Sequence, residues 1–377
     1  MHAVLHALSI TGSMTWEITW ALILGFALSA VVQAVVRKST VVSLLGDDRP
    51  RTLAVAAALG AASSSCSYAA VALARSLFHK GADFTAAMAF EIASTNLVVE
   101  LGVILALLLG WQFTAAELIG GPIMIVVLAV LFRLFLRDSL LRQAREQAAR
   151  GVAGSMEGHA AMDMSMRRKG SFARRLLSAE GFTSTAHVFV MEWSAILRDL
   201  VIGLLIAGAI AAWVPDSFWH SFFFDGHPLA SRLWGPVIGP LVAMASFVCS
   251  IGNVPLAVVL WKGGISFGGV VAFIFADLLI LPILHIYRKY YGARTALFLL
   301  GTFYLATVIA GYIVEFIFGG LGLVPDQAGA KLPVEGITWN YTTFLNITFL
   351  LLAAALLLRF FRTGGRGMLR MMGGTPR

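Results

Sequence analysis

Both cysteines of the chain occupy matching positions in a pattern that occurs twice. Residues 62–93 align without a gap on residues 245–276, with 13 identities in 32 positions, and the offset of 183 residues pairs Cys66–Ser67 with Cys249–Ser250. Thiolates are soft ligands, so two of them brought together can coordinate trivalent arsenic, antimony or Cu(I). The residues leave open two alternatives, inert packing thiols or a disulfide.

Carboxyl and amide side chains follow each cysteine segment, inside apolar runs. A charge at the centre of a bilayer costs at least about 2.5–3.5 kcal/mol, so it needs a partner, a cavity or a proton. Counting ~1.5 Å per residue from the start of its run places Asp277 about 15 Å deep. We therefore predict Glu91 and Asp277 as proton-coupling residues and Asn96 as a substrate contact, with Glu100 and His285 as weaker candidates. Each of these side chains can equally be a structural hydrogen-bonder between helices.

The composition indicates a membrane protein. Hydrophobic residues make up 59% of the chain and charged residues 13%, and the mean hydropathy is +0.84. Soluble domains carry about 25% charged residues. Apolar runs approach or exceed the ~20 residues that cross a bilayer; they lie at residues 20–36, 84–109, 119–136, 197–214, 267–286, 296–318 and 344–358. The first 36 residues lack Lys and Arg, so we expect no cleaved signal peptide and a first span that belongs to the fold.

The distribution of basic residues predicts the topology. Lys and Arg cluster at residues 37–51, 133–175, 288–294 and 359–377, which is typical of cytoplasmic loops and argues against nucleic-acid binding. All four clusters lie on the same side of the membrane only if each cysteine segment enters and leaves the membrane on one side. The tips suit such re-entrant segments, because Ser63–Ser67 can bond freed backbone groups, while Gly252, Asn253 and Pro255 interrupt a helix. Two full, kinked spans are the competing interpretation.

The predicted fold is therefore an all-α polytopic membrane protein with inverted structural repeats. It has about seven full spans plus two re-entrant or broken segments, or nine spans if both segments cross. The expected divisions are a first membrane repeat (1–136), a basic, Met-containing and partly disordered cytoplasmic linker (137–188), a second membrane repeat (189–318), and an outer loop, final helix and basic tail (319–377). We expect an inner-membrane location in a bacterium, with the N-terminus outside and the C-terminus cytoplasmic.

The repeat cores resemble a known family. Cys66–Ser67, Lys80–Gly81 and the run from Ala89 to Asn96 are similar to the first signature of the bacterial predicted permeases, which include the methylated-arsenical efflux permeases of the ArsP type. Cys249–Ser250, the run from Val254 to Ala257 and the segment from Gly264 to Phe273 resemble the second signature. The resemblance covers residues 60–110 and 240–291 and implies an inner-membrane permease whose cysteine segments contact the substrate. The chain departs from the first signature, since Ser65 and Tyr68 stand where the family often has proline and a further cysteine.

These observations predict a secondary transporter, an exporter of a small soft or neutral solute by alternating access. Paired polar breaks in a repeated membrane fold are the best sequence indication of a substrate site. The predicted substrate contacts are Cys66, Ser67, Cys249, Ser250, Asn253 and Asn96. The sequence has no Walker-type ATP-binding loop, so we expect that this chain does not itself power transport by ATP hydrolysis. We expect no catalytic residue, resident metal or cofactor; the partners are the bilayer, the solute and, if transport is coupled, protons.

Two other functions remain open at this stage. One is a membrane-embedded thiol or metal enzyme, although the chain lacks a Cys-x-x-Cys pair and a His-Glu-x-x-His site. The other is a partner that delivers metal through the Met- and His-containing linker between Met156 and Met166. The sequence does not identify the solute, the direction, the coupling ion or whether the chain forms a homo-oligomer.

Overall fold

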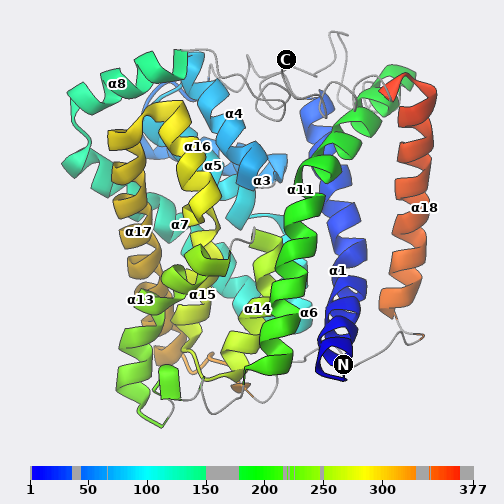
Figure 1. Ribbon diagram of the computed structural model, residues 1–377. Coiled ribbons are helices and arrows are strands. Elements are labelled where there is room, and N and C mark those ends of the chain that lie inside the picture. The colour runs from blue at the N-terminus through cyan, green and yellow to red at the C-terminus, as the bar shows by residue number, and fades with distance from the viewer. Residues whose placement is uncertain are drawn as a thin grey trace.

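All regular elements that the structure describes are helices. The computed structural model describes residues 2–35, 44–65, 67–149, 178–214, 219, 221–224, 226–246, 250–327, 339 and 341–365. The first half contains α1 (His2–Val35), α3 (Pro50–Ser63), α4 (Ser67–His79), α5 (Phe84–Asn96), α6 (Val99–Leu108), α7 (Trp111–Phe135) and α8 (Asp138–Ala149). The second half contains α11 (Ala179–Trp213), α13 (Pro228–Ser246), α14 (Ser250–Lys262), α15 (Phe267–Phe275), the 3₁₀ helix η1 (Ala276–Leu279), α16 (Leu281–Tyr291), α17 (Ala293–Gly320) and α18 (Tyr341–Arg362) (Figure 1). The predicted all-helical class is confirmed for these residues.

Three described helices are long and apolar enough to cross a bilayer. They are α7, α17 and the Thr342–Arg362 part of α18. Two further pairs meet the same criteria together but are bent, by 40° between α5 and α6 and by 43° between the α15–η1 segment and α16. Length and composition thus support up to five crossings among the described residues.

Both bends fall inside apolar runs that the sequence predicts as long enough to cross a bilayer. In the second half, Pro282 lies in the first turn of α16, and proline cannot continue the hydrogen-bond ladder of a preceding helix. At the first bend, between α5 and α6, there is no proline. There Leu97 leaves the helical region, with φ −121° and ψ 40°, and Asn96 turns its side chain toward another element, as described below. The runs over 84–109 and 267–286 therefore each contain a broken pair of helices that meets the span criteria as one unit.

Helix boundaries recur at the offset of the sequence repeat. α4 (Ser67–His79) and α14 (Ser250–Lys262) cover equivalent residues, and α5 and α15 begin at the equivalent Phe84 and Phe267. The packing recurs as well, because α3 and α4 contact α5 while α13 and α14 contact α15. At each α4–α5 or α14–α15 contact an aromatic pair meets edge to face, Phe78 with Phe84 and Trp261 with Phe267.

The turn between the two helices of each pair is also the same. After α4, Gly81 has φ +109° and Ala82 donates its N–H to the Leu77 carbonyl; after α14, Gly264 has φ +95° and Ile265 donates to Leu260. This is the glycine-dependent Schellman ending of a helix. Asp83 and Ser266 then cap α5 and α15 by accepting the N–H groups of Ala86 and Gly269, as side-chain oxygens do at helix N-termini. The sequence repeat is thus also a repeat of local structure.

Each cysteine segment begins and returns at the same end of the molecule. The Asp83 N–H, after α4, donates to the Leu45 carbonyl, before α3, at 2.7 Å. In the second half the Ser231 hydroxyl, near the start of α13, donates to the Gly264 carbonyl, after α14, at 3.3 Å. Figure 1 shows α3 and α4 at the upper end and α13 and α14 at the lower end. The two segments therefore enter the helical bundle from opposite ends.

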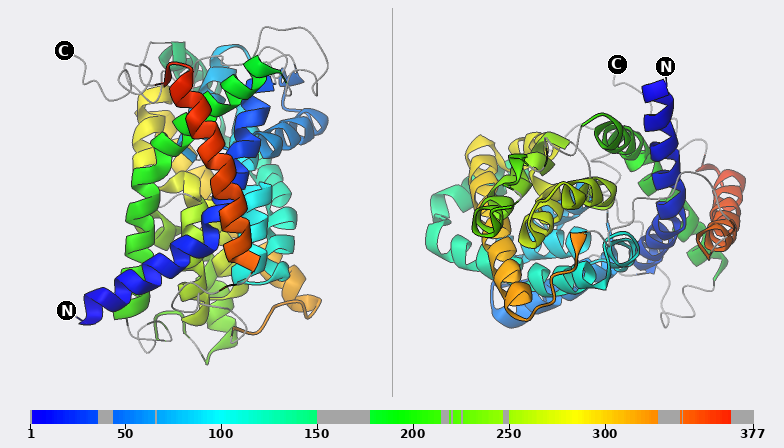
Figure 2. Two further views of the ribbon diagram at one scale, coloured as in Figure 1. Left: turned by 90° about the vertical axis from the view of Figure 1, so that its right-hand side faces the viewer. Right: turned by 90° about the horizontal axis from the view of Figure 1, so that it is seen from below.

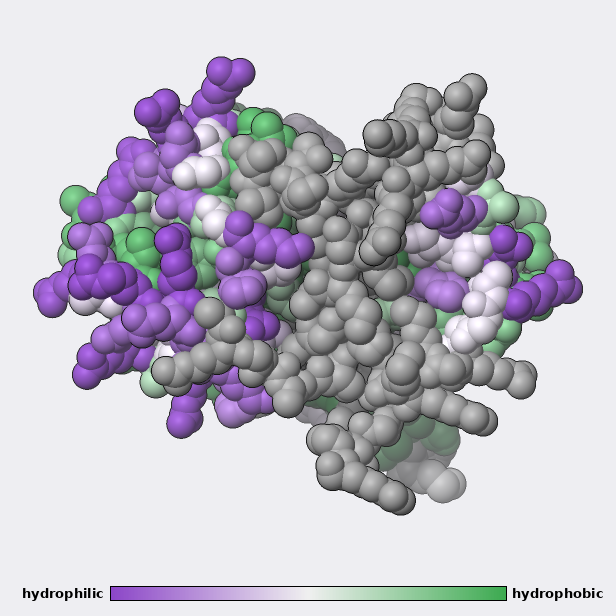
Figure 3. All heavy atoms as spheres, turned by 90° about the horizontal axis from the view of Figure 1, so that it is seen from above, coloured by the Kyte–Doolittle hydropathy of each residue, from purple (hydrophilic) through white to green (hydrophobic). Residues whose placement is uncertain are grey.

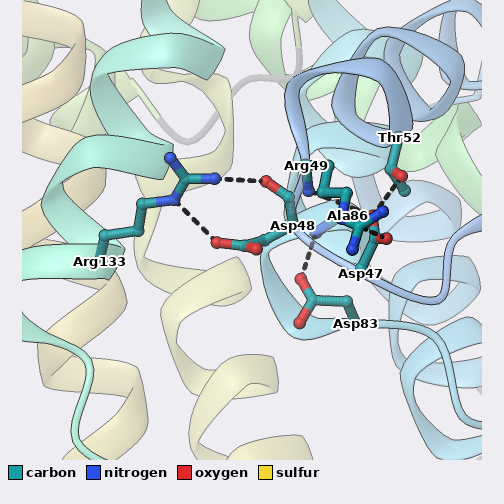
Figure 4. A network of polar contacts seen from close by, with 7 residues as sticks. All are labelled: Asp47, Asp48, Arg49, Thr52, Asp83, Ala86 and Arg133. Atoms are coloured by element: carbon teal, nitrogen blue, oxygen red, sulfur yellow. Dashed lines mark hydrogen bonds and ion pairs between the residues drawn. The ribbon is translucent and has the colours of Figure 1, made fainter.

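A polar network fastens the entry to the first segment. Arg133 of α7 donates a hydrogen bond from Nε to the Asp48 carboxylate at 2.8 Å and another from Nη2 to the Asp48 backbone carbonyl at 2.8 Å (Figure 4). Thr52 donates a hydrogen bond to Asp47, and this bond, with the Arg49 N–H, lowers the pKa of the exposed Asp47 carboxyl. α3 is thereby tied to the end of α7.

The end of the molecule that contains α8 carries most of the described basic side chains. α1 begins at the opposite end and α18 ends at this one (Figure 2). Basic residues occupy the last turns of α7, α16 and α18, at Arg133, Arg288, Lys289, Arg359 and Arg362. Arg145 of α8 lies over the Phe78 ring at 5.2 Å and so docks α8 on α4. The face is broadly hydrophilic over these elements (Figure 3).

The close crossing of α3 and α5 yields a stability prediction. A Cβ at Gly60 would collide with the Phe90 carbonyl of α5, whereas one at Gly301 of α17 meets nothing within 4 Å. We expect Gly60→Ala to destabilise the detergent-solubilised protein by about 1–3 kcal/mol, as overpacking does. Gly301→Ala should be neutral or stabilising by up to about 1 kcal/mol, through helix propensity. Thermal unfolding followed by size-exclusion chromatography measures both effects. Equal unfolding midpoints for the two variants would contradict the close contact between α3 and α5 at Gly60.

Candidate functional site

The tip of the first segment is built from buried serines. α3 ends at Ser63, and Ser64 adopts the left-handed conformation with φ 42°. The Ser65 N–H donates to the Ser94 carbonyl of α5 at 2.8 Å, and the Ser63 and Ser65 hydroxyls lie 2.9 Å apart. These bonds satisfy polar groups that a helix break would otherwise leave unpaired. Cys66, the next residue, lies outside the described residues.

The tip of the second segment is described on both sides of its cysteine. α13 ends at Ser246, whose hydroxyl lies 3.2 Å from Oδ1 of the predicted site residue Asn253 on α14. Asn253 is fully buried. Cys249 lies outside the described residues, as does the side chain of Ser250. Their predicted roles as substrate contacts, like that of Cys66, stay predictions.

Asp277 joins the two halves of the chain. It lies on η1, fully buried, and accepts hydrogen bonds from the Ser67 hydroxyl at 2.7 Å and from the Asn96 amide at 3.1 Å. Ser67 opens α4 directly after the first tip, and Asn96 closes α5 at the bend. Three of the residues singled out in the sequence therefore meet, although 210 and 181 positions separate Ser67 and Asn96 from Asp277.

Glu91 lies next to this contact. It is fully buried on α5, accepts a hydrogen bond from the Tyr287 hydroxyl of α16, and interacts electrostatically with Asp277. We call Ser67, Glu91, Asn96, Asp277 and Tyr287 the crossing cluster. Its members come from α4, α5, η1 and α16, so both halves of the chain contribute.

The crossing cluster retains unused hydrogen-bonding capacity. In the described part, Oδ1 of Asn96 and Oε2 of Glu91 are buried without a hydrogen-bond partner, and so is Nδ2 of Asn253, outside the cluster. Buried polar atoms in native proteins are nearly always paired, so each exception calls for an explanation. A polar ligand bound at the cluster would pair the free atoms of Asn96 and Glu91.

The sign of the buried charge limits what the cluster can bind. The buried charged side chains of the described part are all acidic: Glu91, Glu100, Glu117, Asp277 and Glu315. Glu315 is paired, since it accepts the Gly268 N–H at 2.5 Å and lies 3.5 Å from Arg232. Unpaired carboxylates in a low-dielectric interior must be protonated or neutralised by a cation. The interior is therefore unsuited to an anion.

Some residues fall outside the crossing cluster, and others were not anticipated. His285, a weaker candidate from the sequence, is exposed on α16 and is not a member of the crossing cluster. Glu100 instead accepts a hydrogen bond from Ser64. Tyr287 and Glu117 were missed: tyrosine is common near membrane boundaries, and an isolated glutamate early in an apolar helix gives no spacing signal. Within the described residues no group of three or more His, Cys, Asp or Glu could hold a metal ion, and residues 156–166 of the linker lie outside them.

The apolar helices and the buried crossing cluster define a multi-pass helical membrane protein. The comparisons with known proteins name its class more closely. A family model described as "Predicted permease" matches residues 3–316, and the chain belongs to this family. The chain is also 75% identical over 374 residues to Rv2963 of Mycobacterium tuberculosis, which is named as a permease; the match covers 99% of this chain and 92% of that protein. No solved structure matches the chain significantly. The family resemblance of the sequence motifs is thereby confirmed.

The bond between Glu91 and Tyr287 leads to a prediction with a matched control. Tyr287→Phe removes the donor and leaves Glu91 buried with less support, so we expect a loss of about 1–3 kcal/mol in unfolding free energy. Tyr291→Phe removes a hydroxyl on the same helix that has no hydrogen-bond partner among the described residues, and should be neutral or stabilising. Thermal unfolding of the two variants in one detergent measures the difference. Equal loss in both would show that ring packing, rather than the bond, matters.

Proposed function

We propose that the chain is a secondary transporter that moves a small solute through the crossing cluster by alternating access. The observation that carries the proposal is the pair of hydrogen bonds from Ser67 and Asn96 to Asp277. Transporters of this general design bind substrate where discontinuous helices of two repeats meet near the membrane midplane. Here the meeting point lies at two helix breaks, and Ser67 directly follows the first cysteine in the sequence.

The proposed topology has inverted repeats. The first segment enters from the end that carries α8 and the second from the opposite end, which supports opposite insertion. The seven full spans are α1, α5–α6, α7, α11, α15–η1–α16, α17 and α18. Their division into repeats follows residues 1–136 and 189–318, with the linker between them and the final helix after them. Because basic side chains gather at the α8 end, we assign that end to the cytoplasm of a bacterial inner membrane, with the N-terminus outside.

The chemistry of the cluster supports a soft solute that is neutral or cationic. Substrate contacts would be Cys66, Ser67, Cys249, Ser250, Asn253 and Asn96, with the two thiols as soft ligands. The acidic interior disfavours anions, and the unpaired amide groups favour a solute with hydrogen-bonding groups. Trivalent arsenicals and soft metal ions match this description. Export is the proposed direction, with Glu91 or Asp277 exchanging a proton as the coupling ion.

Uptake into everted membrane vesicles tests this proposal. We expect wild-type protein to accumulate trivalent methylarsenical, arsenite or Cu(I) in a manner that depends on the proton gradient. Cys66→Ser, Cys249→Ser and Asp277→Asn should each lower the initial rate at least tenfold, which corresponds to about 1.4 kcal/mol of lost stabilisation. Glu315→Gln is the matched control, since it alters a buried acid far from these residues in sequence and paired elsewhere, and should keep most of the rate.

Three results would count against the proposal. Normal rates in all three variants, at equal insertion, would remove the cysteines and Asp277 from the pathway. Chemical turnover of the solute without its accumulation would indicate an enzyme, although no described residue cluster favours one. Loss of accumulation on deleting residues 156–166 would instead indicate metal delivery through the linker.

A further inference from the structure

A second pair of buried carboxylates lies apart from the crossing cluster. Glu100 is in the first turn of α6 and Glu117 is on α7, and their exposed fractions are 4% and 2%. The two helices pack against each other. No ion pair to either side chain is found in the described part of the chain. We call these two residues the acidic pair.

The Glu117 carboxylate is directed toward the helix that carries Glu100. A Cβ built at Gly102 of α6 would lie 3.3 Å from Oε2 of Glu117, so the Glu117 carboxylate reaches across to α6. Glu100 and Glu117 interact electrostatically. The Thr114 hydroxyl, one turn before Glu117, donates to the Gly102 carbonyl at 2.7 Å and holds the two helices in register.

The pair lacks the donors that would stabilise two negative charges. In the described part, neither oxygen of Glu117 has a hydrogen-bond partner, and Glu100 accepts one bond, from the Ser64 hydroxyl to Oε1. The Val98 N–H, at the break before α6, interacts with Glu117 but is not placed to form such a bond. Two like charges buried side by side are strongly unfavourable, and carboxylates so placed share a proton.

The other titratable groups on the neighbouring helices do not neutralise the pair. The helices packed against α6 and α7 carry His2, His6 and Glu17 on α1, Glu91 on α5, Lys262 on α14, and Arg294, Tyr304, Tyr312 and Glu315 on α17, with Arg133 at the end of α7 itself. Glu91, Glu315 and the two tyrosines bond elsewhere. His6, Arg133, Lys262 and Arg294 are exposed. No described cation therefore faces the carboxylates.

The acidic pair is connected to the first cysteine tip. The Ser64 hydroxyl donates to Oε1 of Glu100, and Ser64 is a non-glycine residue in the left-handed conformation. Only Ser65 separates Ser64 from Cys66, and Ser65 is itself bonded to Ser94 of α5. A change of charge on Glu100 would alter this bond and with it the conformation of the tip.

We propose that the Glu100–Glu117 pair is a proton-binding site that couples protonation to the conformation of the first cysteine tip. A proton suits the site better than a metal ion, because only two carboxylates and one hydroxyl converge there and no described cluster offers a third acidic, His or Cys ligand. Binding forms an O–H bond on one carboxylate and removes one of two buried negative charges. The coupling role rests on the proposed function, whereas proton binding by the pair does not.

Infrared difference spectroscopy of the purified full-length protein in lipid tests the proposal. In a pH titration we expect a carbonyl band of a protonated carboxylic acid that disappears as the pH rises. Glu117→Gln and Glu100→Gln should each remove this transition, while Glu315→Gln should retain it. Ser64→Gly tolerates the left-handed backbone and removes the small side chain that carries the hydroxyl, so it should move the pH of the transition while the fold persists.

The titration needs no solute, so its result is independent of the transport assay. An identical transition in wild type, Glu100→Gln and Glu117→Gln would overturn the proposal. So would a band that is present at every pH and lost in the variants, because a coupling site must exchange its proton. A transition produced by Na⁺ or K⁺ at fixed pH would assign the pair to a metal cation instead.

If wild type shows uptake that depends on the gradient, Glu117→Gln provides the link between the two proposals. We expect this variant to retain solute flux down a solute gradient and to lose the part driven by protons. If Glu117→Gln lost both the downhill and the proton-driven flux, while wild type still showed the infrared transition, the pair would remain a proton-binding site. Its role in coupling, as distinct from transport itself, would be rejected.

Discussion

The interaction on which this arrangement depends is the acceptance of two hydrogen bonds by the buried Asp277 carboxylate. An ionisable group at this depth in a bilayer is costly, and the cost falls only if donors surround it or a proton occupies it. Two of its donors, Ser67 and Asn96, come from the other half of the chain and from two helix ends. The fold must therefore bring the break after α3 and the bend after α5 to the same point as the 3₁₀ segment η1.

The repeated turns explain how the chain achieves this. A glycine with positive φ and a capping oxygen follow α4 and α14 alike, so each cysteine segment returns to the end where it began. The first segment thereby carries Ser67, directly after its tip, into the interior, where the crossing cluster lies. The acidic pair is linked to the same region, since Ser64 connects the first tip to Glu100 through a hydrogen bond. In the described interior the buried charged side chains are acids, without a buried Lys or Arg. Such an interior favours the binding of protons and cations over that of anions.

Much of this could be predicted from the sequence, because the repeat and the hydropathy are local signals. The equivalence of Cys66 and Cys249 followed from aligning one half on the other, and Glu91, Asn96 and Asp277 stood out as polar residues inside apolar runs. The bend at Leu97 could not be foreseen, since no proline or glycine marks it and its cause includes a bond from Asn96 to a residue 181 positions away. Tyr287 and Glu117 were missed for the same reason: their roles arise from contacts between helices that no spacing within one helix reveals. His285 was placed by helical periodicity along a run that in fact breaks at Ile280.

A double-mutant cycle between Ser67 and Asp277 tests the central claim most directly. Ser67→Ala, Asp277→Asn and the double variant would be compared by unfolding free energy in detergent. If the bond joins the two halves of the chain, the single effects should be non-additive, with a coupling energy of about 0.5–3 kcal/mol. Ser76→Ala, about 14 Å further along α4, should combine additively with Asp277→Asn. Additive effects for Ser67 as well would contradict the claim that the two halves meet at Asp277.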